Sequence, residues 1–388
     1  MPEELNEMFY REPYCREFDA EVIQCVKGKK YWEVILEDTA FYPEGGGQPA
    51  DHGTLNSIDV VDVHRRNGVI VHYCTEALAE GSTVHGVIDW NRRFDHMQQH
   101  SGEHIVSGII HQRYGYENVG FHMGDVIQID FNGELTNEDL HWIEREANTR
   151  IWRNIPIEIT YPSEEELKNM WYRSKKELEG KIRIVTVDDS DICACCGTHV
   201  QRTGEIGIIH LISVEKHKDG SRIEMLAGQR AWQWLRTAAD QNTEISHLFS
   251  AKPLETAEAV KKYMNQSTGT NHKLSRLRKE YIAMKADMLE KTDTQILIEN
   301  DLDADAARML ANNLLESNKA DTVAVLSEIT ENTCRYLVMS KTLDLKSTGA
   351  EMRKRLTVKG GGSAVMQQGM IENKTEEVKG VLEELLRR

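Results

Sequence analysis

Several features of familiar protein classes are missing from this sequence, and each absence narrows the function. No apolar run approaches the roughly 20 residues that a membrane-spanning helix needs. Residues 1–7 are acidic and lack the apolar core of a secretory signal, so we expect a cytoplasmic protein with no membrane contact. Seven cysteines, an odd number in 388 residues, do not suggest a disulfide framework. In such a chain, the crowding of Cys193, Cys195 and Cys196 points to metal or redox chemistry.

The sequence also lacks an excess of positive charge. Its formal net charge of -16 argues against a protein that coats itself in nucleic acid without specificity. A local basic patch is still compatible with this charge: residues 341–388 hold ten Lys or Arg against seven Asp or Glu. That excess is small, and a solvated helical surface explains it equally well.

Hydrophobic periodicity predicts an α+β fold. Short apolar runs separated by Gly, Asn and Asp over residues 20–90 indicate the strands of a small β-barrel or sandwich. A helical period begins at Asn91, a second helix is capped by Thr136, and strands are expected at 126–131, 182–187 and 205–214. The last hundred residues alternate strand and helix, as in a separate α/β domain. The predicted domain bounds are 1–90, 91–250, a helical connector at 251–291, and 292–388.

Two short segments carry residues with metal-ligand spacing. His100 and His104 lie at i and i+4, on one face of a helix and within reach of a single ion. About ninety residues later, His199 follows Cys195 by four residues and Cys196 by three. Thiolate and imidazole together suit Zn²⁺, although a buried cluster of free cysteines is the alternative. Spacing alone does not separate Cys195 from Cys196.

Two glycine-rich segments offer exposed backbone. In residues 41–53, three consecutive glycines lie beside Glu44, Gln48 and Asp51; a tight turn is the structural explanation and a ligand-binding loop the functional one. Residues 357–369 contain a second triple glycine before Ser363 that could bind phosphate. This segment lacks Walker A spacing and the Rossmann order, so it implies no nucleotide cofactor.

Taken in order, these segments resemble the alanyl-tRNA editing proteins of the AlaX type. That family is similar to the editing and C-terminal parts of alanyl-tRNA synthetase. The resemblance covers nearly the whole chain and rests on five motifs: Phe41-Tyr-Pro-Glu-Gly-Gly-Gly-Gln-Pro, His100-x-x-x-His104, Cys195-x-Gly-Thr-His199, Thr203-Gly-Glu-Ile-Gly207, and Arg222-Ile-Glu224 before Gly228. It implies a small β-barrel, a zinc-containing α+β editing domain, a helical connector and a C-terminal α/β domain of the DHHA1 type. No Asp-His-His tripeptide occurs, so we expect no phosphoesterase site.

The resemblance also implies an activity and a set of site residues. One Zn²⁺ would bind at His100, His104, Cys195 and His199, which leaves Cys193 and Cys196 outside the ligand set. The chain would hydrolyse tRNA(Ala) that carries the wrong amino acid, serine first and glycine second, without charging tRNA itself. The residues expected to assist hydrolysis are the amides of Gly46 and Gly47, with Gln48 and His122 facing the substrate. The residues expected to contact tRNA are Lys359, Gly360, Gly361, Gly362, Arg353, Lys354 and Arg355.

Two other functions fit the same motifs. His100-Ser-Gly-Glu-His104 matches the inverzincin peptidases, in which Glu103 would be the general base. Four protein ligands are also typical of a closed structural zinc site on a non-catalytic tRNA-binding module. A further alternative concerns assembly. The apolar seam over residues 274–288 either packs inside the chain or joins two chains as a homodimer.

Overall fold

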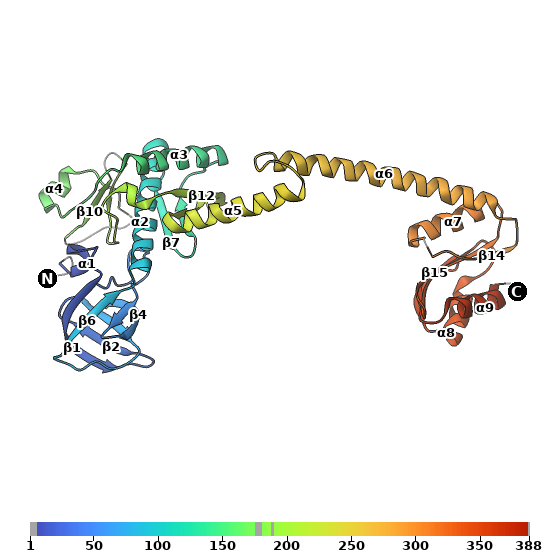
Figure 1. Ribbon diagram of the computed structural model, residues 1–388, viewed down its shortest axis with the longest axis horizontal. Helices are drawn as coiled ribbons and strands as arrows, with labels where there is room; N and C mark the ends of the chain where they lie inside the picture. The colour runs from blue at the N-terminus through green and yellow to red at the C-terminus, as the bar shows by residue number, and fades with distance from the viewer. Residues whose placement is uncertain (1–5, 175–180, 188–189, 301, 387–388) are drawn as a thin grey trace. The chain divides into compact units, whose positions relative to one another are not determined.

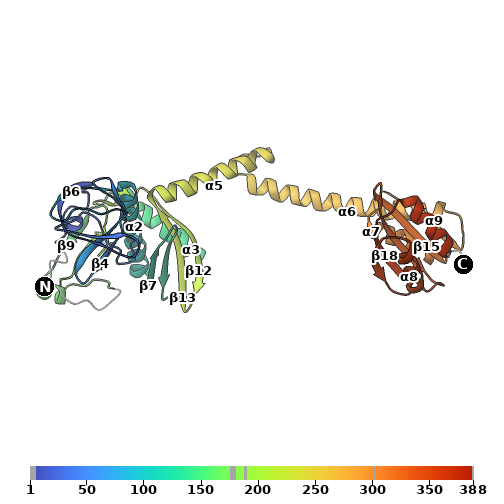
Figure 2. The same cartoon turned by 90° about the horizontal axis from the view of Figure 1, so that it is seen from below.

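A computed structural model describes residues 6–174, 181–187, 190–300 and 302–386 (Figures 1 and 2). The chain divides into two compact units, Met1–Glu244 and Ile245–Arg388. None of the described helices combines the length and apolar character that a membrane span requires.

The first unit begins with a closed six-stranded barrel, so of the two sequence-based alternatives, barrel and sandwich, the barrel is found (Figure 1). Its strand order is β1-β2-β5-β4-β3-β6. Alternate residues of β1, namely Phe18, Ala20 and Val22, are buried in its interior, as the pleat of a strand requires. The barrel and the short helix before it have these bounds: α1 (Met8–Arg11), β1 (Glu17–Lys27), β2 (Trp32–Leu36), β3 (Gly53–Leu55), β4 (Ile58–Arg66), β5 (Val69–Cys74) and β6 (Thr83–Ile88).

Helix α2 (Trp90–Tyr114) leaves the barrel and forms the centre of the α+β part of this unit. Asp89 caps it by accepting a hydrogen bond from the Arg92 amide, and Gly115 ends it in the left-handed conformation. Two sheets accompany α2, with strand orders β12-β13-β8-β7 and β11-β10-β9. The remaining elements are β7 (Asn118–Met123), β8 (Ile127–Phe131), α3 (Asn137–Arg153), β9 (Ile157–Thr160), α4 (Glu164–Asn169), β10 (Ile184–Val187), β11 (Asp191–Ala194), η1 (Thr203–Ile206), β12 (Ile209–His217), β13 (Gly220–Ala227) and α5 (Gly228–Leu248).

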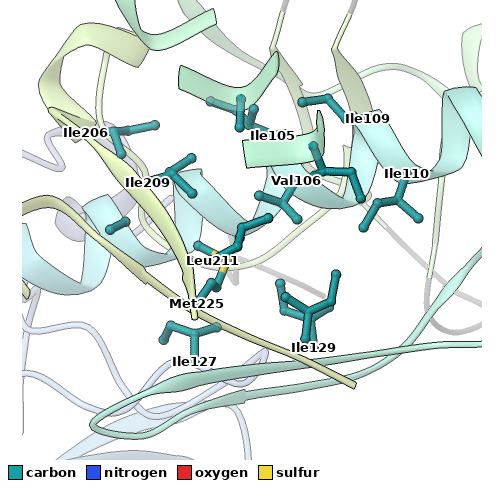
Figure 3. Close-up of a cluster of buried hydrophobic side chains, with 14 of the residues drawn as sticks. Ile105, Val106, Ile109, Ile110, Ile127, Ile129, Ile206, Ile209, Leu211 and Met225 are labelled. Atoms are coloured by element: carbon teal, nitrogen blue, oxygen red, sulfur yellow. The ribbon is translucent and has the colours of Figure 1, made fainter. Parts of the chain in front are cut away.

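One hydrophobic core fixes α2 against the larger sheet. Figure 3 shows Ile105, Val106, Ile109 and Ile110 of α2 in one cluster with the side chains of Ile127, Leu211 and Met225 from the strands. Because the apolar side of α2 is used for this core, its histidines are held in fixed positions along the helix.

One predicted strand was placed wrongly. Residues 205–214 were expected to be a strand, but Thr203–Ile206 forms a 3-10 turn and the strand begins only at Ile209. Gly207, with φ of 82°, breaks the extended path between them. The predicted cap at Thr136 is confirmed, because its hydroxyl accepts from the Asp139 amide while the Asp139 carboxylate accepts from the Thr136 amide.

The second unit is a three-layer α/β domain preceded by a long helix. Its five-stranded sheet has the order β14-β15-β16-β18-β17, with only the β14–β15 pair parallel among the described strands. One face of the sheet packs against α6 and α7, and the other against α8 and α9. The bounds are α6 (Thr256–Met288), β14 (Thr294–Ile298), α7 (Ala304–Glu316), β15 (Thr322–Thr330), β16 (Thr333–Ser340), α8 (Leu345–Arg355), β17 (Val358–Gly362), β18 (Met366–Ile371) and α9 (Thr375–Leu386).

Candidate metal centre

Four side chains from two distant segments meet in the first unit. The ligand atoms of His100, His104, Cys195 and His199 all lie within 4.8 Å of one another. Helix α2 supplies the two i, i+4 histidines, and the loop that follows β11 supplies the cysteine and the third histidine. The three histidines are almost fully buried, whereas Cys195 is partly exposed. The three imidazoles are thus shielded from solvent, and Cys195 is the one residue of this cluster with a partly exposed surface.

The loop approaches α2 closely because residue 197 is glycine. A β-carbon at Gly197 would lie 2.0 Å from Cε1 of His100, which no side chain could tolerate without a shift of the loop. The Gly197 amide also donates a hydrogen bond to Sγ of Cys195, at 3.3 Å. This glycine therefore serves the centre in two ways, by leaving room for a ligand and by bonding to another.

Each histidine has its Nδ1 atom next to a hydrogen-bonding partner. His100 Nδ1 lies 2.9 Å from Oε1 of Gln48, and His104 Nδ1 lies 2.8 Å from Oδ2 of Asp191. His199 Nδ1 lies 3.3 Å from Oγ of Ser101. Such partners fix the ring orientation and leave the three Nε2 atoms for the centre, as is usual for histidines that bind metal.

The chemistry of these donors fits a metal ion. Nε2 of His199 is buried and has no hydrogen-bond partner in the part of the chain that the structure describes, although buried polar atoms are normally satisfied. Burial alone would raise the pKa of the Cys195 thiol, but the three surrounding imidazoles lower it well below its ordinary value. A thiolate with three imidazole nitrogens is a ligand set that Zn²⁺ favours.

The geometry separates the two cysteines that spacing left open. Cys195 belongs to the cluster, whereas the Cys196 side chain is exposed. The Cys196 carbonyl accepts hydrogen bonds from the hydroxyls of Tyr10, at 2.9 Å, and Tyr42, at 3.1 Å. Burial raises the pKa of both tyrosines, so they remain protonated donors.

The first glycine-rich segment forms a tight turn beside the centre. Gly45 and Gln48 exchange two backbone hydrogen bonds, and both Gly46 and Gly47 have positive φ, as a two-residue hairpin turn of the primed type requires. Gly46 has open space where a side chain would be, whereas a β-carbon at Gly47 would lie 2.6 Å from the ring of Phe121. The segment therefore forms the tight turn that was one of the two alternatives, and it also exposes backbone near the cluster.

Gln48 is committed to the protein rather than exposed to a substrate. Its side chain is fully buried, and its Oε1 also accepts from the Thr198 amide at 3.0 Å. Its Nε2 donates to Oγ1 of Thr198 at 2.8 Å. This bonding favours a role in orienting His100 over the direct substrate contact that the sequence suggested.

The structure does not bring His122 to the centre. His122 is exposed on β7, and its neighbour Phe121 is the buried residue, with its ring centroid 5.2 Å from that of His100. Successive strand residues point to opposite faces, so a shift of one position decides which of the two side chains faces the cluster. Phe121 is thus a wall of the site that the sequence reasoning missed.

Asp191 was also missed as a functional residue. It is buried and accepts bonds from His104 and from the guanidinium of Arg173, whose Nε lies 2.7 Å from Oδ1. Its only sequence signal is its position just before the cysteine cluster. Glu103 is buried on α2 and accepts from Oγ of Ser107 at 2.7 Å, and it does not belong to the cluster of four. A Cys-His₃ set is not the ligand set of an inverzincin peptidase.

The predicted tRNA contacts lie in the second unit, on an exposed surface of α8 and β17. Lys354, Arg355 and Lys359 are each paired with a carboxylate, whereas the described contacts of Arg353 are with the carbonyls of Gly349 and Gly360. The glycines have a structural reason of their own. A β-carbon at Gly360 would lie 2.3 Å from the Gln368 carbonyl oxygen and one at Gly362 would lie 2.0 Å from that of Met366, while Gly361 has room.

Comparison with known proteins places these features in a family. The family described as "Threonyl and Alanyl tRNA synthetase second additional domain" matches residues 182–224, which include the cysteine loop. The family "tRNA synthetases class II (A)" matches residues 13–92, which include the barrel. One solved structure, the C-Ala domain of alanyl-tRNA synthetase from Aquifex aeolicus, is 23% identical, with a TM-score of 0.23; the match covers 26% of this chain and all of that one.

Curated relatives carry the assignment. The alanyl-tRNA editing protein AlaX-L of Pyrococcus horikoshii is 30% identical over 99% of this chain and 98% of its own length. The alanyl-tRNA editing protein Aarsd1 of Mus musculus is 34% identical over 66% of each chain, so this match spans about two thirds of the mouse protein. An alanine–tRNA ligase of Thermococcus kodakarensis is 31% identical over 94% of this chain but only 42% of its own length. The match along the whole of AlaX-L shows that this chain belongs to the family of alanyl-tRNA editing proteins.

Proposed function

We propose that the protein hydrolyses the ester bond of tRNA(Ala) that carries the wrong amino acid, serine chiefly and glycine second. The observation that supports this most is the cluster of three buried histidines and a partly exposed cysteine beside an open glycine turn. The cluster provides an ion-binding centre, and the turn provides backbone next to it. The names of the full-length relative and of the mouse relative, both alanyl-tRNA editing proteins, support this substrate class.

The proposed ion is Zn²⁺, held by His100, His104, Cys195 and His199. The buried, unpartnered Nε2 of His199 supports a bound cation, and the single soft sulfur among nitrogens supports zinc. When bound, zinc would polarise or anchor the group that lies next to it. The partners at the three Nδ1 atoms hold the imidazoles in place for this role.

The chain itself supplies position and hydrogen-bond donors. An aminoacyl ester is already activated, so hydrolysis needs mainly an oriented water and stabilisation of a developing oxyanion. Gly46 and Gly47 are the candidate donors, because in the described structure their amides make no backbone bond outside the turn, whereas Gly45 donates to Gln48. Gln48 acts through His100. A polar partner for the serine hydroxyl would account for discrimination against alanine.

The competing function is a closed structural zinc site on a tRNA-binding module. It would share the ligands but not the hydrolysis. We favour the enzyme because Cys195 is a partly exposed residue and Gly46 of the neighbouring turn has open space where a side chain would be.

The second unit is proposed to hold the body of the tRNA. Arg353 is the strongest candidate for a phosphate contact, because its described partners are carbonyls, which leave its charge unneutralised. It lies against the glycine strand β17 at the edge of the sheet. Lys354, Arg355 and Lys359 each have a carboxylate partner, and each would have to leave it in order to contact a phosphate of the tRNA.

A homodimer through α6 is also proposed. Five apolar residues of the seam are at least half exposed although the unit has two apolar cores: Leu274, Leu277, Tyr281, Met284 and Met288. Only Ile282 and Ala286 of α6 are buried among the described residues, and they face α7. A monomer mass in light scattering would contradict this assembly.

Metal analysis combined with deacylation tests the proposed centre. The double variant His100→Ala/Cys195→Ala should lose both stoichiometric zinc and hydrolysis of seryl-tRNA(Ala). The matched control is Cys196→Ala, which removes a neighbouring thiol outside the cluster and should retain zinc. Zinc retained at one ion per chain by the double variant would overturn the ligand assignment. Zinc lost without any change in hydrolysis would overturn its role in the reaction.

A further inference from the structure

The loop between Cys195 and Gly197 is held by three side chains from separate parts of the first unit. Arg183, just before β10, donates from Nη1 to the Cys195 carbonyl at 2.8 Å. Tyr10 of α1 and Tyr42 of the glycine-rich segment both donate to the Cys196 carbonyl, at 2.9 and 3.1 Å. Two consecutive carbonyls of the metal-binding loop are thus fixed by groups that contribute no ligand.

The carbonyl that the two tyrosines share belongs to a particular peptide group. A peptide group joins the carbonyl of one residue to the amide of the next, so the Cys196 carbonyl and the Gly197 amide are two ends of one dipole. The Gly197 amide is the group that donates to Sγ of Cys195, at 3.3 Å. The hydrogen bonds therefore form one chain, from tyrosine hydroxyl through the peptide group to the ligand sulfur.

We infer that Tyr10 and Tyr42 tune the metal-binding sulfur of Cys195 through the Cys196–Gly197 peptide group. Hydrogen bonds in such a chain polarise one another, so a donor at the carbonyl makes the amide at the other end a stronger donor. A stronger N–H bond withdraws electron density from the thiolate, and hydrogen bonds around a ligand are a known means of tuning a metal site. Both tyrosines are positioning residues, because they reach the metal only through this peptide.

Tyr42 connects this chain to the glycine turn. Its hydroxyl lies 3.0 Å from the Gly45 carbonyl as well as 3.1 Å from that of Cys196. One hydroxyl proton is shared between the two carbonyls, so a movement of the turn would change how strongly Tyr42 bonds to the metal loop. Tyr10 has the Arg183 guanidinium 5.2 Å from its ring centroid, which holds the ring in place. This inference rests on the proposed metal centre. It adds two tyrosine hydroxyls that influence the Cys195 sulfur.

Cobalt substitution tests the inference. Co²⁺ is loaded into the full-length protein in place of zinc, and the thiolate-to-cobalt charge-transfer band is recorded for Tyr10→Phe, Tyr42→Phe and the double variant. Loss of the hydroxyls should weaken the bond from Gly197 and make the sulfur a better donor. The band should therefore move to longer wavelength, furthest in the double variant.

Tyr14→Phe is the matched control. Tyr14 also has a hydroxyl engaged inside the protein, since it accepts from the Gln201 amide at 3.0 Å, but among the described hydrogen bonds none joins it to residues 195–197. Its removal should leave the band in place. Bands that coincide in wild type, control and double variant would overturn the tuning role, whereas a wild-type protein that binds no Co²⁺ would instead contradict the proposed centre.

The Gly197 amide proton gives a second readout, which does not require metal. In protein labelled with ¹⁵N-glycine, its resonance should move upfield in Tyr10→Phe and Tyr42→Phe as the N–H···S bond lengthens. The other glycine amides identify any variant that has lost its fold. An unmoved Gly197 resonance in a folded double variant would also overturn the inference.

Discussion

Asp51 of the glycine-rich segment and Arg93 of α2 form an ion pair in which neither side chain is exposed to solvent. Nε of Arg93 lies 3.0 and 2.9 Å from the two carboxylate oxygens, and Nη1 donates to the Pro13 carbonyl at 3.0 Å. The pair joins the barrel to the helix that carries His100 and His104 of the cluster. It also explains the acidic residue at the end of the motif, which the sequence reasoning had considered only as a polar group near a loop.

Breaking this pair should destabilise the first unit. Asp51→Asn or Arg93→Met leaves one buried charge without its partner, and such changes cost about 3–5 kcal/mol. The exposed pair of Arg66 and Glu33 is the control, because Arg66→Met should cost less than about 1 kcal/mol. Urea unfolding measures both. Similar losses for Arg93→Met and Arg66→Met would show that the buried pair is not the link described.

Stability of the barrel should fall in mild acid because of His72. This residue is fully buried, with Nδ1 at 3.1 Å from the Val34 carbonyl and Nε2 at 2.8 Å from Oγ1 of Thr39. The Val34 carbonyl can only accept, so Nδ1 carries a proton, and in the neutral ring Nε2 accepts from the Thr39 hydroxyl. Burial lowers the pKa of His72 to about 4 from 6.5, so the unfolded chain binds the proton first as pH falls.

The consequence is a loss of stability between pH 6.5 and pH 4, with full stability above that range. The free energy of unfolding should be about 3 kcal/mol lower at pH 4 than above pH 6.5. His72→Gln has no group that titrates there, so its deficit relative to wild type should shrink as the pH falls. Denaturant unfolding at several pH values measures this difference. A deficit that stays constant from pH 6.5 to pH 4 would contradict a buried neutral histidine.

Asp191 should matter for metal affinity although it is not a ligand. It orients His104 and neutralises Arg173, so Asp191→Asn should lower metal affinity about 10–100-fold. Asp130→Asn is the comparison, since Asp130 pairs with Arg222 and lies outside the cluster. Competition with a chromogenic chelator measures both affinities. Equal metal affinities in the two variants would contradict a role for Asp191 in supporting the centre.

Binding of tRNA should depend on Arg353 more than on its neighbours. Arg353→Ala should weaken binding and make the salt dependence shallower by about one unit of slope. Lys354→Ala should change both less, because Lys354 is already paired with Glu351 at 2.6 Å. Titration of tRNA(Ala) at several salt concentrations measures the slopes. A larger effect of Lys354→Ala would contradict the assignment of the unneutralised cation.

The sequence reasoning succeeded where the signal was local. The i, i+4 histidines on a helix, the cap at Thr136 and the turn at Gly45–Gln48 depend on residues within one or two turns of chain. Contacts between residues far apart in the chain could not be predicted in this way. The contact of Tyr10 with Cys196 spans 186 residues, and no periodicity reports such a pairing.

Two side chains lie elsewhere than the sequence suggested, each for a definite reason. The sequence favours His122 because its side chain is polar. The pleat of β7 instead buries Phe121 on the side of the centre and leaves His122 exposed. Gln48 was expected at the substrate, but burial commits its amide to His100 and Thr198. The choice of Cys195 over Cys196 came from family resemblance, and the geometry now gives a reason for it.

The most direct test of the whole account is the deacylation of tRNA(Ala) charged separately with serine, glycine and alanine. The account predicts fast release of serine, slower release of glycine and little release of alanine, with the tRNA left intact. Equal rates for all three amino acids would contradict selective editing. No release of any amino acid by zinc-loaded protein would identify the centre as a closed structural site.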